Sequence, residues 1–335
     1  MELIRTGRLT EGNIVAQNIY DGNHNLLVGH GNILTETTIK RLMSRGIDDV
    51  YIDTAVSSGI ETHAPITEVL RSKIVHSLNK LDIDKVEENA IQLVKELNDN
   101  LLDTDMKLIS TYDNMTAQHS LNVAIYAVII GRAIGYNKTQ LEKLAESGLL
   151  HDIGKLMIPK SIINKNGKLN PEERQLILRH SEYGYNYLKD RDNIYSVVRV
   201  GVLEHHENED GTGYPRNLHS DKIHDFAKIL HVADVYDALT SNRSYKKSWS
   251  SDEALEYIKE NTGNQFDKYI VNKFIQNVPK YRKGSRVILS DGRIAIVVRN
   301  RIDDLSNPVV RDTVTMEDIK LWEEPDVGLK IECMA

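Results

Sequence analysis

Histidine and aspartate residues recur through the central part of the chain at intervals that suit one shared metal site. Successive steps of 32, 29, 25 and 28 residues separate His119, the pair His151-Asp152, His180, the pair His205-His206, and Asp234. Each step is about the length of one helix and one connection. A helical domain that folds back on itself can therefore present one donor, or one adjacent pair, on each pass. We predict that these residues meet at a metal centre.

The donor types indicate which metals such a centre would take. Imidazole and carboxylate ligands favour iron, manganese, zinc or nickel over calcium. Consecutive helical residues point about 100° apart, so we expect His205 and His206 to serve two neighbouring ions, one each. The two oxygens of Asp152 could bridge those ions. Two simpler interpretations exist: a His-Asp pair at a helix C-terminus is commonly structural, and His205-His206-Glu207 taken alone could be a solvated surface patch.

The helices that must position these donors lie between residues 111 and 279, and we predict them over about 115–134, 138–150, 171–189, 194–206, 225–241, 251–260 and 267–277. Pairs of a polar cap residue and a Glu or Gln three positions later mark the start of three of them, as in a capping box. These pairs are Asn137 with Gln140, Asn170 with Glu173, and Ser250 with Glu253. The fold class is therefore mainly α.

Both ends of the chain have other patterns. In residues 1–62, short apolar stretches between turn residues predict a small mixed α/β module, with strands near 14–15, 19, 26–28 and 50–52 and a helix over 37–45. In residues 63–110, apolar residues at three- and four-residue steps predict a helical connector, which packs on its own domain or also forms a homodimer interface. In residues 280–335, a period of two around Asp291-Gly292 predicts a small β module packed on the helical core.

Composition excludes several classes of protein. The net charge of −7 argues against a partner that is a nucleic-acid duplex. No stretch approaches the roughly 20 apolar residues that span a bilayer, and the first residues lack the features of a signal peptide. The single cysteine, Cys333, leaves no intramolecular disulfide and favours a reducing compartment. We therefore expect a soluble, cytoplasmic protein in which Cys333 is a buried small apolar residue.

Several unlinked motifs, in one order, resemble those of the HD-GYP family. HD-GYP proteins are metal-dependent phosphodiesterases that degrade the bacterial second messenger cyclic di-GMP. The similarity covers about half of the chain, residues 111–279, and implies a central HD-type helical bundle with this activity. The motifs are His119-Ser120, His151-Asp152-Ile153-Gly154-Lys155, His180, His205-His206-Glu207, Asp210-Gly211-Thr212-Gly213-Tyr214-Pro215, Val232-Ala233-Asp234-Val235-Tyr236-Asp237-Ala238-Leu239, and Arg243-Ser244-Tyr245-Lys246.

The resemblance also implies a role for each matching residue. The implied metal ligands are His119, His151, Asp152, His180, His205, His206 and Asp234. Residues Lys155, Arg243 and Lys246 would hold the substrate phosphate, and the Gly213-Tyr214-Pro215 loop would shape the pocket. Asp152 and Lys155 would be the catalytic residues, although Arg243 and Lys246 could instead belong to a solvated basic face.

Two further positions bear on the number of metals. Some family members have a glutamate that helps to hold a third metal where this chain has Met115. A thioether is a poor ligand for hard divalent iron or manganese, so we expect two divalent ions per chain, iron or manganese. Asp113 matches a common family position, where it either contacts a metal-bound water or caps the helix.

On this interpretation the substrate is a cyclic dinucleotide. A hydroxide that bridges the two metals would open cyclic di-GMP to linear pGpG, with GMP as a further product if hydrolysis continues. One alternative is an HD phosphohydrolase for another nucleotide such as cyclic GMP-AMP, because base selection depends on pocket walls that the sequence does not define. Another is a cyclic-dinucleotide-binding sensor with little turnover.

Overall fold

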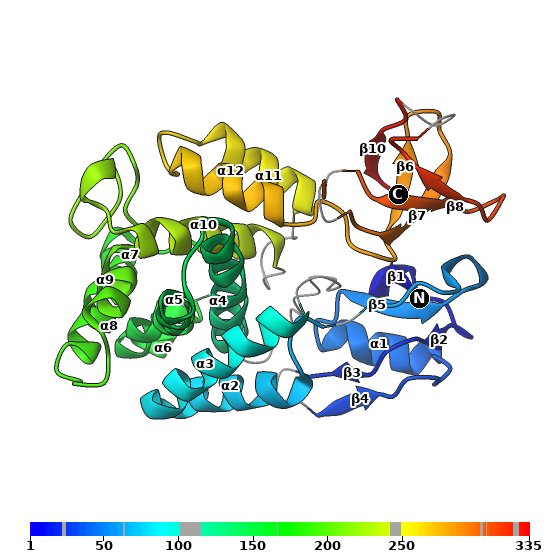
Figure 1. Ribbon diagram of the computed structural model, residues 1–335. Coiled ribbons are helices and arrows are strands. Elements are labelled where there is room, and N and C mark those ends of the chain that lie inside the picture. Colours follow the sequence, from blue (N-terminus) through cyan, green and yellow to red (C-terminus); the bar gives the residue numbers. More distant parts are fainter. Residues whose placement is uncertain are drawn as a thin grey trace.

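The computed structural model describes residues 1–21, 25–62, 64–100, 115–165, 167–241, 249–301, 304–305, 307–323 and 328–335. Over these ranges a helical body lies on one side and two small β-containing modules lie on the other (Figure 1). The mainly α prediction, with a mixed module before the helices and a β module after them, is confirmed.

The helical body begins with two helices of the predicted connector and continues through the central domain. A 3-10 turn, η3 (Ile153–Met157), follows the helix that ends before His151. The helices are α2 (Glu68–Lys80), α3 (Ile83–Asn100), α4 (Met115–Ala133), α5 (Lys138–Leu150), α6 (Lys160–Ile163), α7 (Pro171–Leu178), α8 (His180–Leu188), α9 (Ser196–Glu204), α10 (Asp225–Thr240), α11 (Ser251–Glu260) and α12 (Lys268–Asn277).

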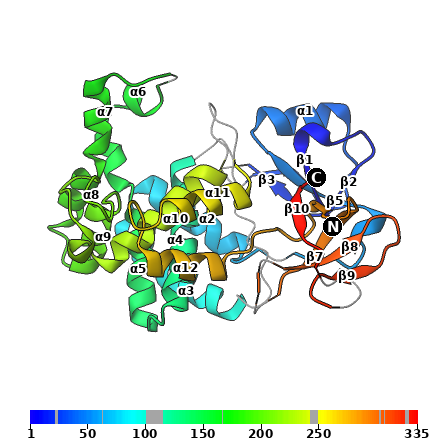
Figure 2. The same cartoon turned by 90° about the horizontal axis from the view of Figure 1, so that it is seen from above.

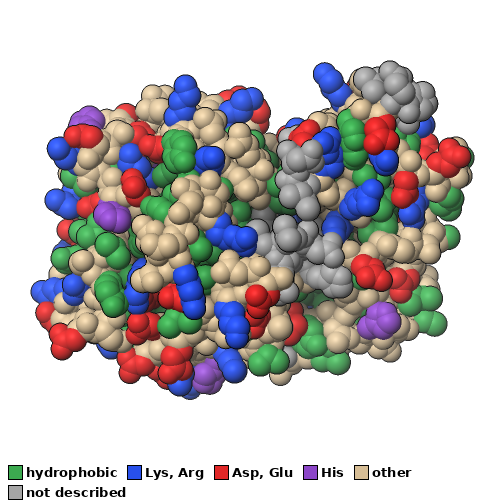
Figure 3. Space-filling model, in the orientation of Figure 1, with side chains coloured by type: hydrophobic (Ala, Val, Ile, Leu, Met, Phe, Trp, Pro, Cys, Tyr) green, Lys and Arg blue, Asp and Glu red, His purple; other side chains and the backbone are tan. Residues whose placement is uncertain are grey.

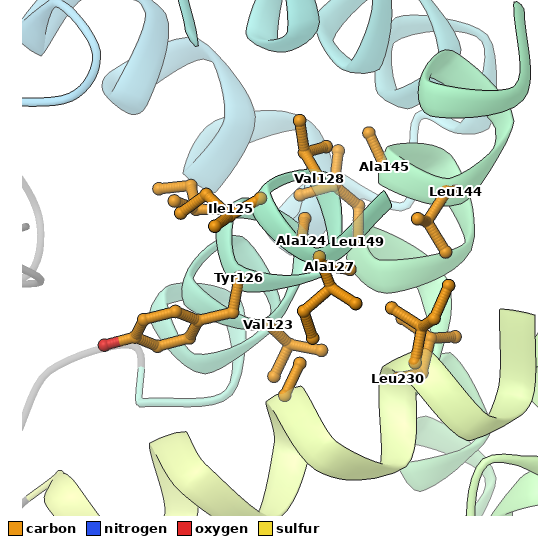
Figure 4. Packing of buried hydrophobic residues seen from close by; sticks show 14 of the residues in the cluster. Val123, Ala124, Ile125, Tyr126, Ala127, Val128, Leu144, Ala145, Leu149 and Leu230 are labelled. Carbon is orange, nitrogen blue, oxygen red and sulfur yellow. The ribbon is translucent and has the colours of Figure 1, made fainter. Parts of the chain in front are cut away.

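Helix α4 is the central element of this body. Its residues 120–131 are all buried, as expected of a helix surrounded by other helices. Its residues Val123, Ala124 and Ala127 are fully buried, and the surrounding cluster includes Leu144 of α5 and Leu230 of α10 (Figure 4). The helices that supply most of the predicted donors are therefore packed around one rigid axis.

The capping signals predicted the helix starts correctly. All three capping boxes are present, at Asn137, Asn170 and Ser250. Two helix ends differ from the prediction. The helix expected over 171–189 is two helices, because the chain leaves helical geometry at Arg179, where ψ is −1°. The helix expected over 194–206 ends at Glu204, so both following histidines lie beyond its last turn.

The N-terminal module contains the predicted strands and helix together with one strand that the prediction missed. Its three-stranded antiparallel sheet has the order β1-β5-β2, and β3 pairs with β4. The elements are β1 (Glu2–Arg5), β2 (Ile14–Val15), β3 (Ile19–Tyr20), β4 (Leu26–Val28), α1 (Glu36–Ser44) and β5 (Asp49–Asp53). Strand β1 is only four residues long and exists through its pairing with the distant β5, so no local pattern indicates it.

The C-terminal module is a five-stranded antiparallel sheet of order β10-β6-β7-β8-β9. Its strands are β6 (Arg286–Leu289), β7 (Ile294–Arg299), β8 (Val309–Asp312), β9 (Asp318–Lys320) and β10 (Ile331–Met334). The hairpin predicted around Asp291-Gly292 joins β6 to β7, as expected. Cys333 is exposed on the edge strand β10, so the prediction that it is buried was wrong.

This C-terminal sheet packs on the N-terminal module, not on the helical core as predicted (Figures 1 and 2). Ile296 of β7 forms a buried cluster with Val56 and Ile60. At the same boundary, Arg286 pairs with Glu2, their Nε and Oε1 atoms 2.5 Å apart. The buried face of β7 therefore finds its apolar partner in the first 60 residues, a long-range contact that strand periodicity does not indicate.

Helices α2 and α3 pack on their own domain. Their buried residues, among them Leu70, Ile74, Leu93 and Leu97, belong to the same apolar cluster as α4 and α5. A homodimer through these helices, and the boundaries near residues 62, 110 and 280, stay predictions. Among the residues that the structure describes, no helix combines the length and the apolar character needed to cross a membrane.

Candidate metal centre

Seven predicted donors, drawn from five parts of the helical body, lie at one place in the structure. They come from α4 (His119), from the end of α5 (His151 and Asp152), from the start of α8 (His180), from the residues just after α9 (His205 and His206) and from α10 (Asp234). Apart from His119 and His206, which are partly exposed, their side chains are buried. The chain spacing therefore predicted this convergence correctly.

The donors form two groups that could each hold a metal ion. The first donor group is His119, His151 and Asp152, and the second donor group is His180, His205 and His206; within each group the donor atoms lie within 4.8 Å of one another. In the second group, the Nε2 atom of His180 is 3.2 Å from Nε2 of both His205 and His206.

Asp152 lies between the two groups and faces both. Its Oδ2 atom is 3.4 Å from Nε2 of His151 and 3.8 Å from Nε2 of His119, while its Oδ1 atom is 3.4 Å from Nε2 of His180. Oδ1 of Asp152 and Nε2 of His151 are buried and have no hydrogen-bond partner in the described part of the chain. Because buried polar atoms are rarely left unsatisfied, these two atoms fit a site that binds metal ions.

Asp234 also spans the two groups. Its Oδ1 atom is 3.0 Å from Nε2 of His119, and its Oδ2 atom is 3.9 Å from Nδ1 of His206. The sequence pointed to Asp152 as the residue able to bridge two ions. The structure brings a second carboxylate to the same boundary, opposite the end of α5.

The adjacent histidines differ from the prediction that each would serve a different ion. Both rings lie against His180, with the centroids of His205 and His206 4.1 Å apart. The expected 100° separation holds only inside a helix, whereas α9 ends at Glu204 and the backbone of His205 has ψ of −4°. Beyond the last helical turn, both side chains can turn to the same side.

Four of the histidine rings are fixed by a hydrogen bond at Nδ1, which leaves Nε2 to face the centre. The acceptors for three of them are main-chain carbonyls of the preceding turn: Gly148 for His151 at 2.8 Å, Ile177 for His180 at 2.7 Å, and Val202 for His205 at 2.8 Å. A carbonyl only accepts, so each Nδ1 must carry the proton and Nε2 the free electron pair. Bonds of this kind set the tautomer and orientation of metal-binding histidines.

The fourth ring is held by Asp237, a residue that the sequence analysis did not single out. Its Oδ2 atom is 2.7 Å from Nδ1 of His119, and its Oδ1 atom accepts a hydrogen bond of 2.8 Å from Asn122. Asp237 follows Asp234 by three residues on α10, so both carboxylates reach α4 from one face. In the sequence, the three-residue spacing of Asp234 and Asp237 on one predicted helix indicated that the two carboxylates lie on the same face. His231 is similarly structural, since its Nδ1 bonds the carbonyl of His205 at 2.7 Å.

The electrostatics of the two donor groups differ. Burial disfavours the charged form of His119, but its hydrogen bonds with Asp234 and Asp237 outweigh burial and raise its pKa to about 9. In the second donor group, burial lowers the pKa of His180, and it lowers those of His205 and His206 well below the usual value. Burial opposes ionisation of Asp152, yet Lys155 and His151 hold its pKa well below the ordinary range.

Lys155 lies at the edge of the centre, where it was expected to hold substrate. Its Nζ atom donates a hydrogen bond to Oδ2 of Asp152, and its side chain is 30% exposed. The turn that carries it packs closely on α8, because a Cβ on Gly154 would overlap the carbonyl of His180. Arg243, Lys246 and Asp113 lie outside the described residues, and for Met115 the description covers the backbone only.

The Gly213-Tyr214-Pro215 loop closes one side of the centre. The ring of Tyr214 stacks on His206, with centroids 4.6 Å apart and an interplanar angle of 26°. Gly213 is required for the loop to fold back, because a Cβ there would meet the backbone of Glu207 at 2.5 Å.

Glu207 and Glu204 anchor this loop. The buried carboxylate of Glu207 accepts hydrogen bonds from the amides of Arg216 at 2.6 Å and Leu218 at 2.9 Å. Glu204 accepts one from the guanidinium of Arg216 at 2.8 Å and another from the amide of His224 at 3.0 Å. Glu207 was noted in the sequence only as part of its motif; here its carboxylate fixes the loop beside the donors.

Comparisons with known proteins agree with this geometry. The HD domain family matches residues 97–270. A cyclic di-GMP phosphodiesterase of Pseudomonas aeruginosa, PA4108, is 36% identical over 228 residues, which are 67% of this chain and 55% of that protein. The 3′3′-cGAMP-specific phosphodiesterase 2 of Vibrio cholerae is 32% identical over 48% of this chain and 31% of its own length. This chain thus spans about half or less of these two relatives.

Among solved structures, Bd1817, an HDG"Y"P protein from Bdellovibrio bacteriovorus, is similar with a TM-score of 0.50 and 15% identity, over 81% of this chain and 97% of that one. At this identity the similarity concerns the fold alone. Together with the family match and the motifs beside the donors, it confirms the resemblance drawn from the sequence. The chain belongs to the HD domain family, as a protein of the HD-GYP type.

Proposed function

We propose that this chain is a metal-dependent phosphodiesterase that hydrolyses cyclic di-GMP to linear pGpG, with GMP as a further product. The observation that carries the proposal is the position of Asp152 between two donor groups, with one of its oxygens and Nε2 of His151 buried and unsatisfied. Relatives named as cyclic di-GMP phosphodiesterases support the substrate class.

The metal part of the proposal is two divalent ions per chain, iron or manganese. The first donor group would hold one ion with Asp234, and the second donor group would hold the other, with Asp152 reaching both. Ions bound there would lower the pKa of a coordinated water toward neutrality. The mixture of carboxylate and imidazole donors supports iron or manganese.

The chain's own residues would position the substrate. Lys155, which is partly exposed at the edge of the centre, would place a cationic donor beside a non-bridging phosphate oxygen, where negative charge develops during hydrolysis. Tyr214 would form one wall of the pocket and keep the His206 ring in place. We retain Arg243 and Lys246 as proposed phosphate contacts, and Asp152 and Lys155 as the proposed catalytic pair.

Cyclic GMP-AMP is the second candidate substrate. Relatives named as 3′3′-cGAMP-specific phosphodiesterases are 32% to 34% identical to this chain, within the 29% to 36% range of the cyclic di-GMP enzymes. Overall similarity therefore does not separate the two substrates. We keep cyclic di-GMP as the proposal and cyclic GMP-AMP as the substrate to test beside it. A cytoplasmic location and a homodimer are proposed on the sequence alone.

Product analysis tests the function directly. The full chain, purified without oxygen and loaded with iron(II) or manganese, is incubated with cyclic di-GMP and, separately, with cyclic GMP-AMP. We expect metal-dependent conversion of cyclic di-GMP to the linear dinucleotide, and no conversion by Asp152→Ala. Asp190→Ala, at an exposed aspartate after α8, is the matched control. Tight binding of cyclic di-GMP without turnover would instead support a sensor. Faster turnover of cyclic GMP-AMP would overturn the proposal that cyclic di-GMP is the substrate.

A further inference from the structure

A cavity lies where the helical body meets the two end modules. It has a volume of about 620 Å³, within the usual range for sites that bind small molecules. Its walls come from β1 and β5 of the N-terminal module, from the start of α11, and from residues 280–286 that lead into the C-terminal sheet. Lys and Arg side chains lie on both sides of this boundary on the face shown in Figure 3.

The basic residues of this cavity differ in whether their donors are already used. Lys280 pairs with Asp252 at 2.7 Å, Arg286 with Glu2 at 2.5 Å, and Arg8 donates to the carbonyl of Ala335 at 3.0 Å. Two arginines remain, and each comes from a different module. They are Arg5 at the end of β1 and Arg282 before β6.

Both arginines lie beside the same carboxylate, that of Asp49. Arg282 approaches Asp49 only to 3.8 Å, and within the described ranges its guanidinium donates no hydrogen bond. Arg5 is the antiparallel partner of Asp49 in the β1–β5 register, so both side chains lie on one face of the sheet. Arg5 is exposed, and its side chain forms no ion pair with any residue that the structure describes. The guanidinium groups of Arg282 and Arg5 therefore keep donors that can bind an anionic ligand.

Aromatic residues complete the lining. Trp249 and Tyr20 are both partly exposed and line the cavity from opposite modules. Trp249 precedes Ser250, which caps α11, and Asp252 on that helix pairs with Lys280, so the indole belongs to the same wall as the basic segment. A cavity lined by a partly exposed aromatic ring and by guanidinium groups with unused donors is suited to a ligand that has both an aromatic base and a phosphate.

We propose that this cavity is a binding site for a nucleoside monophosphate, separate from the metal centre, with the phosphate on Arg282 and Arg5 and the base against Trp249. The site shares only Asp237 with the surroundings of the metal centre, since this residue lines the cavity and also bonds His119. The proposal does not depend on the activity proposed above.

Fluorescence of Trp249 gives a direct test. The chain has two tryptophans, so Trp322→Phe leaves Trp249 as the reporter. The Asp152→Ala substitution is added to the same chain, because it removes the carboxylate that faces both donor groups and so reduces binding of AMP or GMP at the metal centre. We expect AMP and GMP to change the fluorescence saturably, while adenosine and inorganic phosphate, each lacking half of the ligand, bind at least tenfold more weakly. Calorimetry on the same protein measures binding independently of the indole.

Substitutions on the two walls decide the outcome. Arg282→Gln is expected to weaken AMP binding at least tenfold. Arg5→Gln, on the other module, should weaken it by a similar factor. Either variant tests the proposal if the other one does not fold. Arg299→Gln, at an exposed arginine at the end of β7, is the matched control and should bind normally. No saturable binding at millimolar AMP or GMP, or unchanged binding by folded Arg282→Gln and Arg5→Gln proteins, would overturn the proposal.

Discussion

The two donor groups lie side by side but differ in composition and in charge. The first donor group, His119, His151 and Asp152, lies beside Asp234 and contains a histidine whose pKa is raised to about 9. The second donor group, His180, His205 and His206, is three imidazoles whose pKa values are lowered by burial. Near neutral pH the second group is therefore ready to bind a metal, whereas the first must release a proton.

This difference shows that burial alone does not set the state of a histidine. All five histidines of the two groups are buried or nearly so, yet among these five only His119 has two carboxylates of the described residues as hydrogen-bond partners. Those carboxylates reverse the effect of burial on its pKa. The hydrogen-bond partners of a histidine, more than its burial, thus determine its pKa and so how its donor group responds to pH.

Removing Asp152 should have the largest effect, because its carboxylate lies 3.4 Å from a histidine of each group and its buried Oδ1 has no hydrogen-bond partner among the described residues. For Asp152→Ala we expect the proposed hydrolysis to fall at least about 1,000-fold, the order expected when a group central to the chemistry is lost. Metal content should fall at both groups, with the helical circular dichroism unchanged. The measurement is turnover together with elemental analysis, with Asp190→Ala as control. Full activity with normal metal content would contradict the assignment of Asp152.

Substituting one histidine in each group should separate the two sites. His151→Gln should remove the metal of the first group and His205→Gln that of the second, so each variant should retain about one ion where the parent protein has two. Elemental analysis of matched preparations measures this. If either substitution removed both ions, the groups would form one inseparable site. Three ions in the parent protein would refute the expectation based on Met115.

The convergence of the donors could be predicted from the sequence because it depends on local features. Helix length, capping boxes and one donor per pass are all encoded within about 30 residues, and together they indicated that donors from successive helices would meet. The position of His205 and His206 was not predictable in the same way. It depends on α9 ending at Glu204, and a difference of two residues changes the directions of both rings.

Long-range contacts explain the other differences. Strand β1 forms only by pairing with β5, and the C-terminal sheet finds its apolar partner at Val56 and Ile60. Neither contact leaves a periodic pattern in the sequence. Asp237 is an intermediate case: its spacing from Asp234 was visible, but its role depends on α10 lying against α4.

A substitution at Asp237 should weaken the first group and leave the second unchanged. In Asp237→Asn the side chain keeps its size and can still contact Asn122, but an amide holds the His119 ring less firmly than a carboxylate. Affinity for manganese at the first group should fall about 10- to 100-fold, as when a group that orients a metal ligand is replaced. Titration of chelator-treated protein measures this, with the exposed Asp225→Asn as the control on the same helix. An equal loss at both groups would indicate a general structural effect.

The pH dependence of metal binding should also separate the groups, with a smaller effect. The metal-free pKa of His119 is about 9, above its usual value, so its ring is protonated below that pH and must lose a proton to bind. Affinity at the first group should therefore rise about tenfold per pH unit between pH 6 and 8 and level off above 9. The pKa values of His205 and His206 lie well below 6.5, so affinity at the second group should not change over this range.

Calorimetry in buffers of different ionisation enthalpy counts the protons released at each group. We expect about one proton at the first group near pH 7 and none at the second. The variants that retain a single group, His205→Gln for the first and His151→Gln for the second, allow each count to be made separately. Equal proton release by both variants would contradict the electrostatic difference. It would mean that the two carboxylates beside His119 do not make the first group differ from the second in its proton count near pH 7.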